Sequence, residues 1–444
     1  MTQLSSRSNH AYRLHFENLG LKSNQGDPNW LKLLREQSMD QFETLGFPTE
    51  RKGNEEWKYT DVKNIATTNF VIPSKPTLTY AAEKHLKQAG FDEHDFHRLV
   101  FLDGLYSPQL SSEDVKIKGC TIGPLSQAWN APAVRGTLGT LANWKDHAFT
   151  ALNTAFTRDG ALIHIGPNTK VEKPISIIFL TSQWEEKIAT CPRTLIMLEK
   201  NSSAIIMETH CSIEETEYLS NAVSEISLGN NSHLEHYRLQ MHSKDAYHIG
   251  TTQVLLRQTS QFKSVSADLG GKLIRNNLKT EVAGENASCI LNGLYITNGN
   301  QHVDNHVTID HSQPYTNSRE HFKGVLGDKS TTAFQGSIII RKNSQKVDSY
   351  QENKNLLLSS EAEANTKPAF WIYADDVKCG HGASSGELNE DALFYLLSRG
   401  IPEKEARAML IKGFISEIIA SVEWDLYKSH LENLVEDKLS NMCG

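Results

Sequence analysis

More than 200 residues in the middle of the chain, from about 154 to 378, carry almost no helical periodicity. This segment is a succession of short runs rich in β-branched and aliphatic residues, among them ALIHI, ISIIFL, SAIIME and CILNGLYI. Gly, Asn, Ser or Lys separates each run from the next, which is typical of strands joined by turns. A chain with so much strand and so little helix in its centre must bury its apolar side chains between sheets.

The turns between these runs resemble one another. Four of them combine an apolar residue, three turn-forming residues and a serine, at 198–202, 228–232, 256–260 and 326–330, and the related turn GENAS lies at 284–288. The first three begin 30 and 28 residues apart, which is the period of a solenoid, a propeller or a repeat array. Because such a unit has no room for a helix, we expect a β-solenoid in which each coil stacks on the next. A large β-sandwich with coincidentally similar turns is the alternative.

Helical periodicity appears on either side of this segment. NWLKLLREQSMDQFETLGF predicts a helix that ends at Gly46, and YAAEKHLKQAGF predicts one that ends at Gly90. The stretch EEWKYTDV (55–62) is aromatic and charged, and periodicity does not indicate its role. The predicted division is a mixed, largely helical region at 1–153, a β core at 154–386 and a helical region at 387–444.

The C-terminal region predicts three helices. Asn389 or Ser385 would cap the first, Gly400 would end it, and Pro402 would begin the second, with a third from about 424 to 439. The first two helices share a wide apolar face that includes Leu393, Leu396, Leu410, Phe414 and Ile418. Such a face either packs inside the protein or docks a partner, with the surrounding acidic residues providing steering and specificity.

Charge and motifs exclude several classes of protein. A formal net charge of −8 argues against a dedicated nucleic-acid binder, and no run approaches the roughly 18 apolar residues of a membrane span. The six cysteines are sparse and form no CxxC pair, so the cytoplasm is the simplest compartment. Phosphate-binding, nucleophile-elbow and zinc-protease motifs are absent, and LGGKL at 269–273 lacks the flanking residues of a phosphate loop.

Two groups of residues could bind metal. The segment 302–321 contains His302, His306, His311 and His321 with Asp304 and Asp310. Their spacing matches no standard ligand set, and strand alternation places 302 and 306 on one face and 311 on the other, so structural histidines are favoured.

Cys379 and His381 lie two residues apart, which in a strand puts both side chains on one face, about 7 Å apart. A thiolate and an imidazole suit iron or an iron–sulfur fragment. Two ligands cannot complete a tetrahedral site, so any metal there would need ligands from another chain or from exogenous thiols.

Several longer segments together resemble one family. They are HSQPYTNSREHFKGVLGDKS (311–330), FQGSIIIRKNSQKVDSYQ (334–351), ENKNLLLSSEA (352–362), IYADDVKCGHGASSGEL (372–388) and LFYLLSRGIP (393–402). The chain resembles the SufB/SufD family of iron–sulfur cluster assembly scaffolds over nearly its whole length. EEWKYTDV and the chain length favour the SufD branch over the longer SufB.

This resemblance implies a right-handed parallel β-helix flanked by helical regions, and a non-enzymatic scaffold. It implies pairing with SufB, docking of the ABC-type ATPase SufC on the C-terminal helices, and sulfur delivered by a cysteine desulfurase system. Cys379 and His381 would be candidate ligands of a nascent cluster at the SufB interface. No tightly bound cofactor is expected: iron or a cluster would be transient, and a flavin would occur only in the whole complex. A homodimer is conceivable for the isolated chain.

Two other functions compete with this one. A SufB-type subunit would carry a cluster by itself after reconstitution with iron and sulfide. A secreted β-helix enzyme acting on acidic polysaccharide would need a signal peptide and an acidic calcium cluster beside a basic residue, and no convincing set is present.

Overall fold

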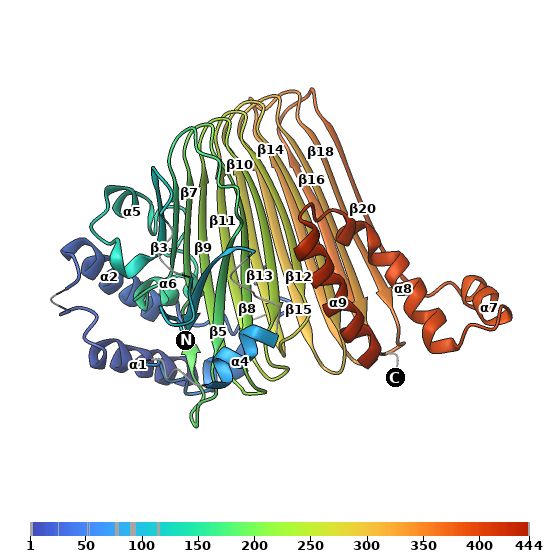
Figure 1. Ribbon diagram of the computed structural model, residues 1–444, viewed down its shortest axis with the longest axis horizontal. Coiled ribbons are helices and arrows are strands. Elements are labelled where there is room, and N and C mark those ends of the chain that lie inside the picture. The colour runs from blue at the N-terminus through green and yellow to red at the C-terminus, as the bar shows by residue number, and fades with distance from the viewer. Residues whose placement is uncertain are drawn as a thin grey trace.

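The computed structural model describes residues 3–24, 26–50, 52, 54–75, 80–88, 95–112 and 116–442. Its centre is a parallel β-solenoid flanked by N- and C-terminal helices (Figure 1). The solenoid confirms the expectation from the turn repeat and rules out the sandwich. Among the described residues, no helix is long and apolar enough to cross a membrane.

Among the described residues, two ten-stranded sheets form the solenoid, and from β7 to β20 the chain alternates between them. The first sheet has the order β2-β1-β5-β8-β10-β12-β14-β16-β18-β20, and the second has the path β19-β17-β15-β13-β11-β9-β7-β4-β3 with β6 beside β9. The strands of the first sheet are β1 His97–Leu102, β2 Leu105–Tyr106, β5 Ile175–Thr181, β8 Ser203–Ser212, β10 His233–Met241, β12 Gln261–Asp268, β14 Ser288–Thr297, β16 Asn317–Leu326, β18 Asp348–Leu357 and β20 Lys378–Glu387. Those of the second are β3 Cys120–Pro124, β4 Ala161–Ile165, β6 Ala189–Thr190, β7 Arg193–Leu198, β9 Leu219–Leu228, β11 Tyr247–Leu256, β13 Leu273–Val282, β15 His302–His311, β17 Thr331–Ile340 and β19 Glu363–Ile372.

The register keeps equivalent residues of successive coils directly beside one another. In the second sheet, Leu228 pairs with Leu256, Leu256 with Val282, and Val282 with His311. Such columns point into the solenoid and form one continuous buried cluster drawn from both sheets. Strand alternation sends the other half of the side chains outward, and the helical regions cover part of them.

The recurring turns owe their similarity to one backbone conformation. Asn201, Asn231, Thr259 and Asn286 have φ between 56° and 58° and all lie where the chain passes from the second sheet to the first. Asparagine tolerates this left-handed conformation better than most residues. The similar turn at 326–330, with Asp328 at φ 51°, lies at the opposite corner, between β16 and β17, so the fourth match in the sequence repeat is not equivalent to the first three.

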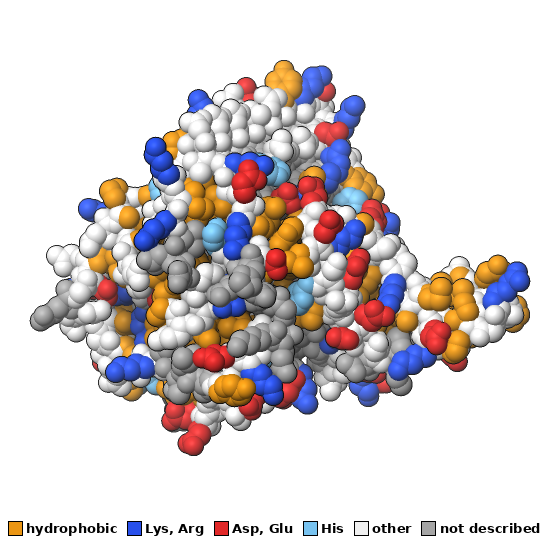
Figure 2. Space-filling model, in the orientation of Figure 1, with side chains coloured by type: hydrophobic (Ala, Val, Ile, Leu, Met, Phe, Trp, Pro, Cys, Tyr) orange, Lys and Arg blue, Asp and Glu red, His pale blue; other side chains and the backbone are white. Residues whose placement is uncertain are grey.

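The C-terminal helices are α7 Glu390–Ser398, α8 Glu403–Ala420 and α9 Asp425–Met442. The Asn389 side chain accepts a hydrogen bond from the backbone N–H of Ala392 at 2.8 Å, so Asn389 is the cap of α7. Helices α8 and α9 lie on the outer face of the first sheet and bury it, whereas α7 projects beyond the sheet (Figures 1 and 2).

The N-terminal region contributes α1 Gln3–Asn18, α2 Asn29–Leu45, α3 Lys63–Thr67, α4 Tyr80–Gln88, α5 Pro132–Thr137, α6 Ala148–Ala155 and a short 3-10 turn at Leu125–Gln127. Helix α2 ends at Gly46, which has φ 64°, as the sequence predicts. The predicted end of α4 at Gly90 lies outside the described residues. This region is not only helical, because β1 pairs in parallel with β5 and β3 pairs antiparallel with β4.

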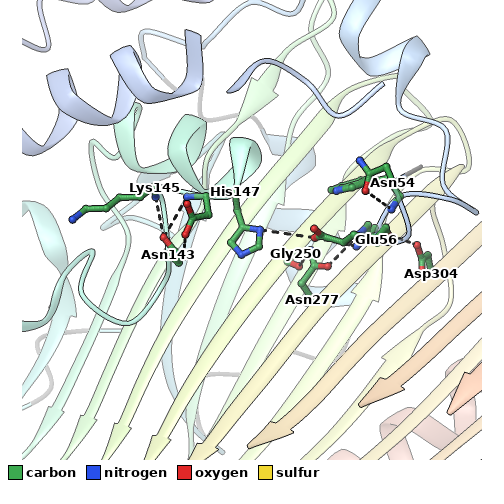
Figure 3. A network of polar contacts seen from close by, with 11 residues as sticks. Asn54, Glu56, Asn143, Lys145, His147, Gly250, Asn277 and Asp304 are labelled. Atoms are coloured by element: carbon green, nitrogen blue, oxygen red, sulfur yellow. Dashed lines mark hydrogen bonds and ion pairs between the residues drawn. The ribbon is translucent and has the colours of Figure 1, made fainter. Parts of the chain in front are cut away.

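The EEWKYTDV segment fastens the N-terminal region to the second sheet (Figure 3). The Arg275 guanidinium lies 3.8 Å above the ring centre of Trp57 and donates hydrogen bonds to the Glu56 carbonyl at 2.7 Å and to Asp304 at 2.8 Å. Burial alone would raise the pKa of Asp304, but Arg275 and His306 outweigh it and hold that pKa well below its usual range. The segment therefore has a structural role that periodicity could not indicate.

Candidate functional site

The solenoid ends in two open strand edges. Strand β20 is the last strand of the first sheet and β19 is the last of the second, and no other strand of the described residues pairs with their outer edges. An exposed row of unpaired backbone N–H and C=O groups is a template for adding strands of another chain. Beside this edge, Trp371 and Tyr373 are 55% and 60% exposed. The end of the solenoid therefore has the features of a protein interface.

Cys379 and His381 lie on this edge strand and share its inward face, as their spacing predicts. Cys379 pairs with the buried Ser349 of β18, and His381 pairs with the buried Gln351. The imidazole is exposed at the mouth of the solenoid, with its ring centre 4.8 Å from that of Phe370. Burial raises the pKa of the half-buried Cys379 thiol, so binding a metal through this sulfur requires displacing a proton.

A buried carboxyl lies in the same inward column as His381. Glu320 pairs in register with Gln351, which pairs in turn with His381. Glu320 accepts a hydrogen bond from the Gln351 amide at 3.0 Å, and burial raises the pKa of this carboxyl to about 8. The polar end of the solenoid interior thus holds a carboxyl that is largely protonated at neutral pH.

The five predicted docking residues of the C-terminal helices do not form one exposed surface. Leu393, Leu396 and Leu410 are half-buried, and Phe414 packs beside the first sheet with the Lys323 ammonium 5.3 Å from its ring centre. Ile418 is 1% exposed and belongs to the cluster under α8, so its inclusion in an accessible docking surface was wrong. The periodic apolar face of α8 covers the solenoid of its own chain.

A different set of side chains on the projecting lobe is exposed. Phe394 is 73% exposed and Met409 is 51% exposed, and Tyr395 and Leu397 add further apolar area. Figure 2 shows hydrophobic side chains gathered on this lobe, away from the body of the protein. Contiguous exposed apolar area of this kind marks an interaction site. We call these four residues, three on α7 and Met409 on α8, the α7 surface.

The four histidines predicted as a possible cluster do not converge. His302 and His306 point outward from β15, whereas His311 points inward and is hydrogen-bonded to Thr316 at 2.8 Å and Ser318 at 2.9 Å. Burial lowers the pKa of His311 to about 4, so it is a neutral core histidine. His321 lies near Glu417 of α8. The structural interpretation of this segment is confirmed.

A histidine cluster that the sequence reasoning missed lies inside the solenoid. His210, His242 and His248 are buried, and one ring nitrogen from each lies within 4.8 Å of the others. Burial lowers the pKa of His242 and of His248 well below the ordinary value, so both rings are neutral at pH 7. The sequence signal for this cluster is histidine at inward-facing positions of successive predicted strands. That signal can be recognised only once the register of the coils is known.

Comparison with known proteins agrees with the architecture. The family model for the SufBD core domain of the SUF system for FeS cluster assembly matches residues 179–414, and the model for the SufBD N-terminal region matches residues 6–177. The chain belongs to the SufBD family.

Its relatives share most of their length with it. An iron–sulfur cluster assembly SufBD family protein of Synechocystis is 33% identical over 87% of this chain and 86% of its own. The iron–sulfur cluster assembly protein SufD of Escherichia coli is 28% identical over 86% of this chain and 87% of its own. The protein of the same name from Bacillus subtilis is 26% identical over 93% and 95%. SufD homologues therefore align with both the solenoid and the flanking regions.

Proposed function

We propose that this protein is a non-catalytic scaffold subunit of cytoplasmic iron–sulfur cluster assembly, which pairs with SufB through the open end of its solenoid. The observation that carries the proposal is the coincidence of two free strand edges with two inward-facing soft ligands on β20. Strand addition at this edge supplies the backbone partners that β19 and β20 lack. It also supplies the ligands that Cys379 and His381 need, because two side chains complete no metal site. Iron and sulfide are here the cargo, held between the two chains during assembly.

The α7 surface is the proposed docking site for the ATPase SufC. Its apolar side chains are exposed on a lobe that stands clear of the solenoid, and Glu390 and Asp391 in the first turn of α7 supply acidic groups nearby. The hydrolysis motifs that this chain lacks would belong to that partner.

Pairing is tested by removing one hydrogen-bond donor from the outer edge of β20. Lys378 donates its N–H to the Val347 carbonyl, directly before β18, so strand alternation turns the N–H of Ala383 to the outer edge. We expect Ala383→Pro to lose the outward donor while keeping the β18 ladder, and to lower SufB binding at least tenfold. Native mass spectrometry of the co-expressed proteins, with iron and sulfide content, measures both pairing and cargo.

Ala383→Ser is the matched control, because it keeps the backbone N–H and a small side chain. SufB binding and cluster content at the wild-type level in Ala383→Pro would show that pairing does not use this edge. Unchanged circular dichroism establishes that the variant has kept its fold.

The docking proposal predicts that polar substitution on the lobe abolishes ATPase capture. Phe394→Ser with Met409→Ser removes much of the exposed apolar area, and we expect SufC binding to fall at least tenfold in a co-purification assay, with SufB pairing intact. Tyr80→Ser is the control, since Tyr80 is an 80% exposed aromatic on α4. Full SufC binding by the double variant would contradict the proposal. Substitution is preferable to deleting 389–444, because that deletion would uncover the sheet beneath α8 and α9.

A further inference from the structure

Two successive coils of the solenoid bring three histidines together in its interior. His210 comes from β8, His242 follows β10, and His248 lies on β11. One ring nitrogen of each lies within 4.8 Å of the other two, and all three side chains are buried. Imidazole is a good ligand for divalent zinc, iron, copper and nickel. Residues 379 and 381 belong to the last coil and take no part in this cluster.

Two of the rings are held by hydrogen bonds on the side away from their neighbours. His210 donates from Nε2 to the Glu208 carboxylate at 2.8 Å, and Nδ1 of His242 is hydrogen-bonded to the Tyr218 hydroxyl at 2.5 Å. Histidines that bind metals usually have their second nitrogen fixed in this way by a carboxylate or another polar group. Glu208 and Tyr218 therefore place the opposite nitrogen of each ring toward the centre of the cluster.

One ring nitrogen of the cluster has no partner in the described part of the chain, and two others are hydrogen-bonded only to each other. Nδ1 of His210 is buried and has no hydrogen-bond partner among the described residues. Nε2 of His242 has only Nδ1 of His248, at 3.0 Å. Buried polar atoms without a partner are uncommon in folded proteins and call for an explanation such as an ion.

Space for a further ligand adjoins the cluster. His210 and His248 line an internal cavity of about 40 Å³, which exceeds the roughly 10–15 Å³ that one water molecule needs. Glu208 places a carboxylate beside the cavity, whereas the positive charge of Arg238 is paired with Asp268 at 3.0 Å. His242 also lines a surface pocket of about 590 Å³ together with Glu215 and Asp245, which offers a route from solvent.

We propose that His210, His242 and His248 bind one divalent transition-metal ion inside the solenoid, with water from the cavity as fourth ligand and Glu208 and Tyr218 as positioning residues. Metal–nitrogen bonds of 2.0–2.1 Å in a tetrahedral site separate the nitrogens by about 3.3 Å, so binding draws the three rings closer together. The site is independent of the pairing function, because it lies several coils from β20.

Metal loading of the purified full-length chain tests this site directly. The tag-free protein is stripped with a chelator and incubated anaerobically with Zn²⁺ in one arm and Fe²⁺ in another. We expect one equivalent of at least one of these metals to remain after gel filtration, measured by elemental analysis. X-ray absorption of the loaded wild-type protein should show nitrogen and oxygen ligands with the outer-shell scattering of about three imidazoles.

Substitutions then assign the ligands. We expect His210→Gln and His248→Gln each to weaken metal binding at least tenfold, and Tyr218→Phe to weaken it about tenfold by releasing His242. His311→Gln is the matched control, since His311 is a buried histidine of the same solenoid outside the cluster, and it should keep full metal content.

Three results would overturn the proposal. They are the absence of stoichiometric metal in the wild-type protein, sulfur ligands or fewer than two imidazoles in its absorption spectrum, and wild-type affinity in both histidine variants. The spectrum of the wild-type protein decides the matter even where a variant fails to fold.

Discussion

Replacing Arg193 by methionine is expected to lower the free energy of unfolding by about 3–5 kcal/mol. Arg193 of β7 and Glu225 of β9 form a completely buried ion pair on the face of the second sheet that the N-terminal region covers. The Glu225 carboxylate also accepts hydrogen bonds from the backbone N–H groups of Gly139, Leu141 and Ala142, at 2.8 to 3.1 Å. Removing the arginine leaves this carboxylate buried without its cation, which is the costly case for an internal ion pair.

The measurement is thermal and urea unfolding of the variant, with hydrogen exchange of residues 139–142 as the local readout. Arg407→Met is the matched control, because Arg407 pairs with Glu403 on the exposed side of α8 and such pairs contribute less than about 1 kcal/mol. We expect adding Glu225→Gln to Arg193→Met to recover part of the loss by removing the unpaired charge. A cost for Arg193→Met no greater than that of the control would contradict the assigned role of the pair.

The free energy of unfolding of the wild-type protein is expected to fall as pH rises because of Glu320. Glu320→Gln is expected to remove this fall. Burial raises the pKa of Glu320 from its ordinary value of 4.5 to about 8. The folded protein then holds a proton that the unfolded chain releases between these two values. The stabilisation is complete below pH 4.5 and is lost as pH rises to about 8, at about 1.4 kcal/mol per pH unit.

The difference in unfolding free energy between wild-type and variant, measured from pH 5 to pH 9, isolates this carboxyl from the other titrating groups. A glutamine is neutral throughout the range and can keep the hydrogen bond with Gln351. Glu285→Gln, at an exposed turn, is the matched control and should leave the pH profile close to that of the wild type. Parallel profiles for wild-type and Glu320→Gln would contradict the raised pKa.

Much of the fold was predictable because it depends on local rules. Turns with one residue in a left-handed conformation, often asparagine, recur once per coil, and short β-branched runs between them leave only stacking as a way to bury apolar area. The same local logic predicted the end of α2 at Gly46 and the shared face of Cys379 and His381. The residue pattern gave one wrong equivalence. The turn at 326–330 has the same residue pattern as the other turns but lies at the opposite corner of the solenoid.

The candidate sites were predictable only in part. A periodic apolar face on a helix shows that the face is buried, but not whether its partner lies in the same chain. Ile418 is such a residue, because α8 packs it against the first sheet of the same chain. Phe394, Tyr395 and Met409 of the α7 surface lie at positions that periodicity does not single out.

By itself, the sequence determined the coil period, the flanking helical regions and the family, and it favoured a solenoid over a sandwich, because each of these follows from residues close together in the chain. Tertiary structure alone decided which residues of different coils meet. His210 and His248 are 38 positions apart in the chain, yet the stacking of coils places them around one point. A change of register by one residue would turn one of them outward, so only the three-dimensional register brings the three histidines together.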